Sequence, residues 1–374
     1  MADPTPSAQT NQPLARIAAA FAGAHAVQGV GPLGNGNINT TYLVERQAAE
    51  PFVLQRINTA VFPQPQHVMH NLLTVGQHVE GRLLGEGAPS GERWVLPRVL
   101  YSRSGEPWLE EGGAFWRAIS FVPATTSLDA LATPGQAREV GYGLGRFHEL
   151  VHDLPCDRLA DTLEGFHITP GYLAHYAAIS AEPAKPSEQE AWAHRFIAQR
   201  APWAGVLERA KATGELPLRP IHGDPKVNNV LLDASSGRAV ALVDLDTVKP
   251  GLVHYDIGDC LRSGCNPLGE ETDHLDAVVF DLTLCEALLE GYGEVAHRFL
   301  GPADHRYLYD AIRLLSFELG LRFFTDHLAG NVYFHTQRPG HNLDRALVQF
   351  RLTESIEAQE RDIRGLLERL QNRR

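Results

Sequence analysis

The chain has 374 residues, 44% hydrophobic content and a formal net charge of −12, which is typical of an acidic globular protein. Its length exceeds what one hydrophobic core usually serves, so two lobes are expected. The sequence lacks the basic patches that bind nucleic acid and the long apolar run of a membrane span. The cysteines have no CxxC spacing and are predicted to be reduced thiols in a cytoplasmic protein, either a monomer or a homodimer.

The N-terminal part of the chain predicts a small lobe rich in strands. Residues 1–12 are rich in Pro, Thr and Gln and are expected to form a disordered tail. Residues 13–122 are predicted to form the N-lobe, an antiparallel sheet with a few helices. Its predicted helices cover 13–24 and 64–84, and its predicted strands cover 27–33, 40–45, 52–57, 94–101 and 115–121.

Residues 123–374 are predicted to form a larger, mostly helical C-lobe. Pro123 to Thr126 interrupts the strand pattern and marks a hinge. Two short apolar runs, 230–232 and 239–243, are predicted to pair as a β-hairpin. Apolar residues at helical spacing predict helices over 134–152, 273–292, 304–329 and 343–370, with an inserted helical pair within 157–214. The predicted fold class is therefore α+β.

The segment His222–Leu231 (HGDPKVNNVL) and the later Asp244 carry the strongest chemical signal. The predicted hairpin returns Asp244 to the neighbourhood of Asp224 and Asn229. Phosphoryl transfer from ATP needs a base for the acceptor hydroxyl and oxygen ligands for Mg²⁺. We therefore predict an ATP- and Mg²⁺-dependent small-molecule kinase, with Asp224 as the base and Asn229 and Asp244 as metal ligands. Lys226 is predicted to neutralise charge on the transferred phosphate. An ordinary turn explains one or two such polar residues, but not the whole set between two strands.

A Gly- and Asn-rich stretch between two predicted strands is the candidate phosphate loop. Its backbone N–H groups can cover ATP phosphates, although a β-hairpin turn favours the same residue types. At the lobe junction, main-chain groups of Ser120 and Val122 are predicted to meet adenine. The predicted nucleotide-binding residues of the loop are Gly34, Asn35, Gly36, Asn37 and Thr40.

The strand after this loop lacks the lysine that kinases use to pair the nucleotide phosphates. The first lysine of the chain is Lys185, beyond the whole predicted N-lobe. Gln55 or Arg56 is predicted to take its place, unless loop amides and the metal hold the phosphates alone. Successive strand residues face opposite ways, so only one of the two can point into the cleft. Arg56 has the charge, whereas Gln55 has the better position.

Together these residues resemble the signature of the aminoglycoside phosphotransferase and choline kinase superfamily, in which His-Gly-Asp is followed by Asn and a later Asp. The resemblance implies a two-lobed protein-kinase-like fold. Further blocks are similar to the N-acetylhexosamine 1-kinase branch, which implies that ATP and Mg²⁺ phosphorylate the anomeric hydroxyl of a hexosamine or N-acetylhexosamine. These blocks are Leu54–Asn58, Val61–Phe62, His222–Asn229, Asp244–Gly251, Tyr255–Asp259 and Leu321–Asp326.

The same resemblance implies that Arg322 and Tyr333 bind the acceptor sugar together with Asp224. A guanidinium fork suits vicinal hydroxyls or an acetamido oxygen. Asp246 is a further candidate for sugar contact. Two other interpretations stay open, in which Arg322 pairs with Asp326 one helical turn away and Tyr333 simply packs.

Acidic residues just after the metal-binding segment are expected to have a structural role. Asp256 and Asp259 are predicted to brace the catalytic loop through Arg262 or His222. His222 itself is expected to pack and hydrogen-bond behind the loop rather than act as the base.

Two rival functions are retained. An aminoglycoside, choline or other amino-alcohol kinase binds a cationic acceptor, and Arg322 argues against a cation. A nucleotide-binding pseudokinase is supported by the missing N-lobe lysine, but the combination of Asp224, Asn229 and Asp244 argues against it.

Overall fold

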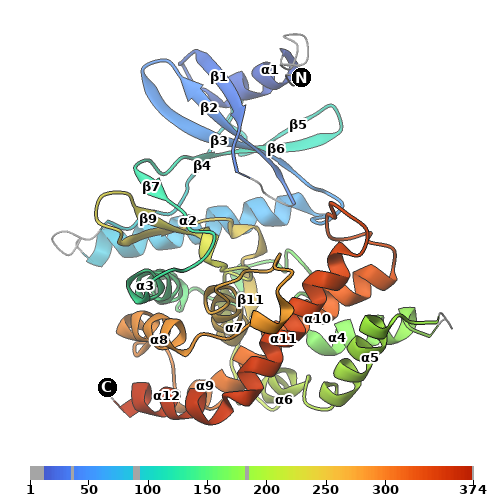
Figure 1. Ribbon diagram of the computed structural model, residues 1–374. Coiled ribbons are helices and arrows are strands. Elements are labelled where there is room, and N and C mark those ends of the chain that lie inside the picture. Colours follow the sequence, from blue (N-terminus) through green and yellow to red (C-terminus); the bar gives the residue numbers. More distant parts are fainter. Residues whose placement is uncertain (1–11, 35–37, 87–92, 182–184, 373–374) are drawn as a thin grey trace.

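The computed structural model describes residues 12–34, 38–86, 93–181 and 185–372. Figure 1 shows a twisted sheet at the top and a larger group of helices below it, with α2 (Pro65–Glu86) running across between them. The expected architecture, a small antiparallel sheet followed by a mostly helical region, is confirmed. The predicted tail at 1–12 lies outside the described residues except for Gln12, where the first helix begins.

The N-terminal sheet is antiparallel, with strand order β1, β2, β3, β6, β4 and with β5 paired to β6. α1 (Gln12–Phe21) covers its upper face, where Ile17 and Phe21 join Phe52 and Leu54 in a small core. The strands are β1 (Val27–Pro32), β2 (Thr40–Arg46), β3 (Ala49–Ile57), β4 (Val99–Leu100), β5 (Leu109–Glu111) and β6 (Ala114–Ser120).

Alternation along β3 decides which side chains face the helical lobe. Phe52 and Leu54 are fully buried on the α1 side, so Val53 and Gln55 point to the opposite side of the sheet. Gln55 stands directly across from Arg117 of β6 in the antiparallel register. Paired residues share a face, so Arg117 also faces the helical lobe.

The helical lobe is built around α3 (Pro134–Val151), which packs along α8 (Leu282–Ala296). Gly141 and Gly291 permit this close packing, because a Cβ at either position would overlap a backbone carbonyl of the other helix. α10 (Leu308–Leu328) packs against α7 (Val253–Gly264) and α11 (His341–Ala358). The other helices are α4 (Thr169–Ile179), α5 (Glu188–Arg200), α6 (Val206–Ala212), α9 (Pro302–Arg306) and α12 (Glu360–Asn372).

Short strands join the sheet lobe to the helices. The predicted hairpin is confirmed, because β9 (Val230–Asp233) pairs antiparallel with β10 (Ala239–Leu242). β7 (Thr125–Thr126), within the predicted hinge, adds to the other edge of β9. β8 (Arg219–Ile221) and β11 (Lys249–Gly251) form a second antiparallel pair. The segment that carries Asp224 runs from β8 to β9, and the segment that carries Asp244 runs from β10 to β11. Because β8 pairs with β11 and β9 pairs with β10, the two segments are held side by side.

The structure differs from the predicted elements in several segments. The predicted strand 94–101 shortens to β4, because Pro97 has no N–H to donate and the Val95 N–H donates instead to the Val240 carbonyl at 2.8 Å. The predicted helix 343–370 divides at Gln359 into α11 and α12, and segment 157–214 holds α4, α5 and α6 rather than a pair. The sequence prediction missed α7, whose buried face carries His and Asp residues that obscure its apolar periodicity.

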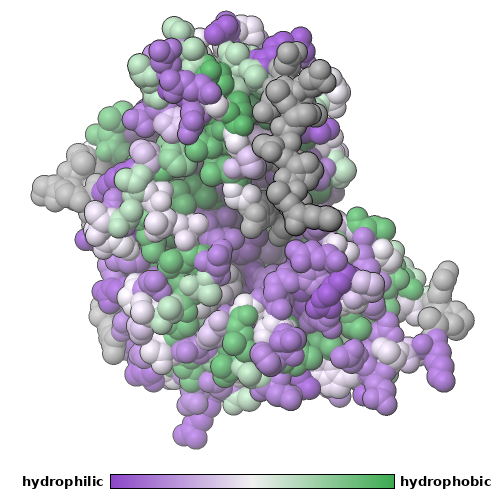
Figure 2. Space-filling model, turned by 45° about the horizontal axis from the view of Figure 1, so that its top comes forward, coloured by the Kyte–Doolittle hydropathy of each residue, from purple (hydrophilic) through white to green (hydrophobic). Residues whose placement is uncertain are grey.

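Figure 2 shows hydrophilic residues gathered at the lower right, over the helical lobe, with hydrophobic residues scattered elsewhere on the same face. Among the described residues, no helix has both the length and the apolar character needed to cross a bilayer.

Candidate active site

The backbone before Asp224 is held by a buried carboxylate on α7. Asp256 accepts hydrogen bonds from the backbone N–H groups of His222 at 2.6 Å and Gly223 at 2.8 Å. It also accepts one from His148 Nε2 at 2.8 Å. The prediction that Asp256 braces the loop is confirmed by these contacts. Asp259 lies further along the same helix and pairs with Arg262, its Oδ1 accepting from Nε at 2.8 Å.

His222 packs behind the loop, as predicted. Its Nε2 donates to the Val243 carbonyl at 2.9 Å, and its Nδ1 accepts from the Asp224 N–H at 3.2 Å. One nitrogen thus donates while the other accepts, which is the pattern of a neutral imidazole. Burial lowers the pKa of His222, in agreement with that neutral form.

Gly223 is required by the shape of this turn. Its φ is +87°, and a Cβ built there would lie 2.7 Å from the Thr247 carbonyl oxygen. The Thr247 hydroxyl also donates to the His222 carbonyl at 2.8 Å. The close approach brings η3 (Leu245–Thr247) directly against the catalytic loop.

The structure brings Asp224, Asn229 and Asp244 together, as the hairpin predicted. Asn229, at the end of η2 (Val227–Asn229), donates from Nδ2 to the Asp224 carbonyl at 2.7 Å. Its own carbonyl accepts from the Val243 N–H at 2.9 Å, which places Asp244 next in line. Burial raises the pKa of Asp224. Burial, followed by repulsion from Asp246 and Asp224, raises the pKa of Asp244 to about 7.

A divalent cation fits this arrangement. A cation beside Asp244 would offset the repulsion from Asp246 and Asp224 that raises its pKa, and the Asn229 side-chain oxygen is not used in the bond that its amide nitrogen makes. Within the described ranges, no three or more His, Cys, Asp or Glu residues are grouped so that they could hold a metal ion by themselves. A Mg²⁺ held by Asn229, Asp244 and phosphate oxygens stays a prediction.

Lys226 lies beside Asp224, the predicted base. Its Nζ is 3.0 Å from Asp224 Oδ2, and both side chains are partly exposed. The charge of Asp224 raises the pKa of Lys226, so the lysine keeps its proton. It is thus a fixed positive charge next to the predicted base.

The predicted phosphate loop lies only partly within the described residues. Asn35, Gly36 and Asn37 fall outside them, while Gly34, with a φ of +68°, and Thr40 are exposed. Asn39, which the sequence analysis did not select, is 8% exposed and donates from Nδ2 to Asp246 Oδ2 at 2.6 Å. Asn39 therefore ties this loop to the segment that carries Asp244.

The structure separates the two candidates for the missing lysine. Arg56 is exposed and stands across from Trp116, whose side chain joins the core under α1. Arg56 is thus on the face opposite the lobe junction, so its position gives the predicted contact with phosphates no support, and that contact stays a prediction. Gln55 does face the junction, and its Oε1 accepts from Arg117 Nε at 2.9 Å and Nη2 at 2.7 Å. The sequence analysis did not select Arg117, although a charged residue inside the otherwise apolar predicted strand 115–121 could have drawn attention to it.

Some of the backbone groups predicted to contact adenine make hydrogen bonds within the protein instead. The Ser120 N–H donates to the Arg98 carbonyl at 2.8 Å, so that amide is not available to a base. The Val122 carbonyl accepts from Thr125 Oγ1 at 2.9 Å, which leaves it a second lone pair. A role for the backbone at Val122 stays a prediction.

Asp246 is in contact with residues of the N-terminal part of the chain. It is 2% exposed, forms an ion pair with Arg117 through Oδ1 and accepts from Asn39 through Oδ2. Oδ2 therefore has a hydrogen-bond partner, whereas Oδ1 is in ion-pair contact with Arg117 but accepts no hydrogen bond among the described residues. The predicted contact between Asp246 and a sugar gains no support from this position and stays a prediction.

Arg322 lies in an aromatic frame on α10. Its guanidinium carbon is 5.0 to 5.8 Å from ring centroids on several sides. Burial lowers the pKa of Arg322, but the neighbouring tyrosines, Glu318 and Asp224 raise it overall, so Arg322 is near enough to Asp224 for their charges to interact. The framing rings are Phe166, Tyr172, Tyr333 and Phe334.

Asp326 folds the loop that carries Tyr333 over Arg322. Its Oδ1 accepts from the backbone N–H groups of Val332 at 2.9 Å and Tyr333 at 2.8 Å, and its Oδ2 accepts from that of Phe334 at 3.0 Å. The carboxylate is thereby committed to the loop, so the alternative in which Arg322 pairs with Asp326 is not the arrangement found. Tyr333 remains 45% exposed and is not simply a packing residue.

A model of a family described as a phosphotransferase enzyme family matches residues 29–298. The chain belongs to this family. The match takes in the strands of the sheet, the catalytic loop and Asp244, but ends before Arg322 and Tyr333. Family membership therefore establishes a phosphotransferase and leaves its acceptor open.

Solved structures share the fold of this phosphotransferase. An aminoglycoside phosphotransferase from Alicyclobacillus acidocaldarius has a TM-score of 0.59 at 16% identity, over 98% of this chain and 98% of that chain. A microcompartment-associated aminopropanol kinase has 0.56 at 17% identity, over 90% and 94%. A spectinomycin phosphotransferase, solved with ADP and spectinomycin, has 0.55 at 13% identity, over 96% and 99%. The predicted kinase-like fold is confirmed, whereas the resemblance to an N-acetylhexosamine 1-kinase branch finds no support in these names.

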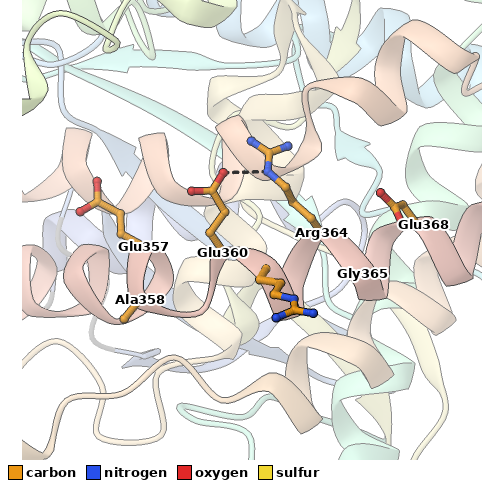
Figure 3. A pocket seen from close by; sticks show the side chains of 7 residues that line it. Glu357, Ala358, Glu360, Arg364, Gly365 and Glu368 are labelled. Carbon is orange, nitrogen blue, oxygen red and sulfur yellow. Dashed lines mark hydrogen bonds and ion pairs between the residues drawn. The ribbon is translucent and has the colours of Figure 1, made fainter.

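A separate depression lies far from this cluster, on the surface of α11 and α12. Figure 3 shows Glu360 and Arg364 paired along its floor, with a hydrogen bond of 2.7 Å. Its lining residues come from the C-terminal helices and include none of the polar residues of the catalytic loop.

Proposed function

We propose that this phosphotransferase moves the terminal phosphoryl group of ATP to the anomeric hydroxyl of a hexosamine, with the N-acetylated sugar preferred to the free amine. The observation that carries the acceptor class is Arg322. Within the described residues this guanidinium has aromatic neighbours but no carboxylate or hydrogen-bond partner, and it interacts with the charge of Asp224. Its free donors suit an acetamido or hydroxyl oxygen and repel an ammonium group.

The chemistry assigned to the chain follows from the site. The acceptor oxygen attacks the terminal phosphorus, the bond from phosphorus to the bridging oxygen breaks, and ADP leaves. Asp224 orients the acceptor hydroxyl and takes its proton, while Lys226 holds a positive charge beside the transferred group. Asn229 and Asp244 would hold Mg²⁺, which when bound neutralises phosphate charge. Most of the rate enhancement would come from positioning and charge neutralisation.

A second candidate is phosphorylation of an aminoglycoside or amino alcohol. The names of the similar structures favour it, since they include aminoglycoside and aminopropanol kinases. At such low identity these matches inform the fold alone, and Arg322 would place a positive charge beside a cationic acceptor. A pseudokinase is the third outcome, in which nucleotide binds but no acceptor is phosphorylated.

An acceptor panel built on matched pairs tests the proposal. Purified protein with Mg²⁺-ATP is given N-acetylglucosamine and glucosamine, N-acetylgalactosamine and galactosamine, and choline, 1-amino-2-propanol, kanamycin and spectinomycin. ADP release gives kcat/KM, and phosphorus NMR identifies the modified position. The proposal expects the highest kcat/KM for an N-acetylated sugar, with phosphate on its anomeric carbon. Higher kcat/KM for a cationic acceptor would establish the second candidate instead.

A further inference from the structure

Arg117 is a buried cation at the lobe junction, near the middle of β6. The residue is 1% exposed and faces the helical lobe, since Gln55 stands directly across from it in the sheet. Its neighbour Trp116 points the other way, into the core under α1. Burying a guanidinium is costly unless it is paired, so its presence in an otherwise apolar strand needs a reason.

Side chains from both lobes hold this guanidinium in place. Gln55 Oε1 accepts from its Nε and Nη2, and Asp246 forms an ion pair with Nη2. Gln55 is oriented in turn by donating to Thr41 Oγ1 at 3.1 Å, and Asp246 is oriented by Asn39. Each partner is thus fixed by a second contact, and the direction of the arginine fork is determined.

One donor of the fork is left over. Arg117 Nη1 is buried and has no hydrogen-bond partner among the described residues. A buried donor without an acceptor is unfavourable, so an oxygen brought to this point gains from meeting it. Asp246, which pairs with Arg117, lies two residues after the predicted metal ligand Asp244 on the same segment. Phosphate oxygens are the acceptors that a guanidinium fork matches best.

We propose that Arg117 binds the phosphate chain of the donor nucleotide through Nη1, with Gln55 and Asp246 as the residues that position it. The inference rests on the proposed function, because it requires a nucleotide donor in this cleft. It gives Arg117, on β6, the phosphate-binding role that was expected of a residue on the neighbouring strand β3. In this structure Arg117 is 1% exposed and in ion-pair contact with Asp246.

The test compares ligands that differ only in their phosphates. Calorimetry with Mg²⁺ measures the Kd of adenosine, ADP and ATP for the wild type and Arg117→Met. Arg117→Met is expected to raise the Kd of ADP and ATP by about 10- to 100-fold and that of adenosine by less than about twofold, since only the phosphates lose a charged partner. Arg16→Met is the charge-matched control in the same lobe, because its side chain is 74% exposed in a surface ion pair with Glu111.

Distinct results would overturn the inference. Arg117→Met with ATP affinity within about twofold of wild type would do so, as would an equal loss for adenosine, which indicates a purely structural role. A phosphate-dependent loss in Arg56→Met but not in Arg117→Met would return the role to β3. If Arg117→Met does not fold by circular dichroism, Arg117→Gln decides: it keeps a hydrogen-bond donor without the charge, and wild-type ATP affinity in it would contradict the proposal. Wild-type protein that binds no nucleotide would instead refute the proposed function.

Discussion

His167 Nε2 donates a 2.7 Å hydrogen bond to the carbonyl oxygen of Gly223, the residue immediately before Asp224. The other ring nitrogen, Nδ1, lies 2.9 Å from Glu318 Oε1. A carbonyl and a carboxylate only accept, so both ring nitrogens carry a proton and His167 is an imidazolium. Burial alone lowers the pKa of His167, but the charge of Glu318 raises it overall. The pair connects α10, which also carries Arg322, to the catalytic loop.

His167→Gln tests this charge through the pH dependence of stability. A histidine whose folded-state pKa is raised contributes stability that is complete below its unfolded pKa, about 6.5. That contribution is lost as the pH rises through the higher folded-state pKa. Urea unfolding at a series of pH values should therefore show the wild type most stable relative to His167→Gln below about pH 6.5, with the difference shrinking above it. A constant difference from pH 5 to pH 9 would mean that His167 is neutral.

Asp224→Asn removes the predicted base and leaves the predicted metal ligands in place. We expect kcat to fall by about two to four orders of magnitude, while the Kd of Mg²⁺-ATP measured by calorimetry stays nearly unchanged. Steady-state turnover with the best sugar of the panel measures the first quantity. Turnover close to wild type would locate the base elsewhere.

Asp244→Ala should abolish the Mg²⁺-dependent part of nucleotide binding. Its carboxylate stands beside Asn229 and is crowded by Asp224 and Asp246, so its loss removes a principal oxygen ligand. Calorimetric titration of ATP with and without Mg²⁺ measures the effect. Asp273→Ala is the control, because that side chain is 88% exposed. If Mg²⁺ strengthens ATP binding equally in Asp244→Ala and the wild type, Asp244 is not a metal ligand.

Arg322→Ala should lower kcat/KM for the sugar while the KM for ATP changes little. Losing a charged hydrogen bond costs about 1.5 to 3 kcal/mol, or roughly one to two orders of magnitude. Arg322→Lys should rescue only part of the loss, since an ammonium lacks the planar fork. Arg364→Ala is a control of the same type. Arg364 lies on α12, and its guanidinium carbon is 4.3 Å from the ring centroid of Tyr309. Unchanged kcat/KM in Arg322→Ala, or improved phosphorylation of kanamycin, would favour a cationic acceptor.

The fold class and the centre of the site were accessible from sequence, because their signals are local. Asp224 and Asn229 lie in one short motif, and Asp244 ends a strand whose pairing follows from a two-strand apolar pattern and a turn. The hairpin needed no knowledge of distant segments. The expectation that Asp256 supports the loop also held, and it rested on the acidic residues that follow the metal-binding segment closely in the chain.

Tertiary structure alone decided which charges meet across the lobes. Arg117 reaches Asp246 only because β6 lies beside β3 and the two share a face toward the helical lobe. In the same register Arg56 lies on the face away from the lobe junction. The face of a strand side chain depends on alternation along the strand and on which side of the sheet the core under α1 packs. The aromatic frame of Arg322 likewise combines residues of distant segments. Local periodicity specifies elements and short motifs, whereas the partners of a buried charge depend on packing between elements that lie far apart in the chain.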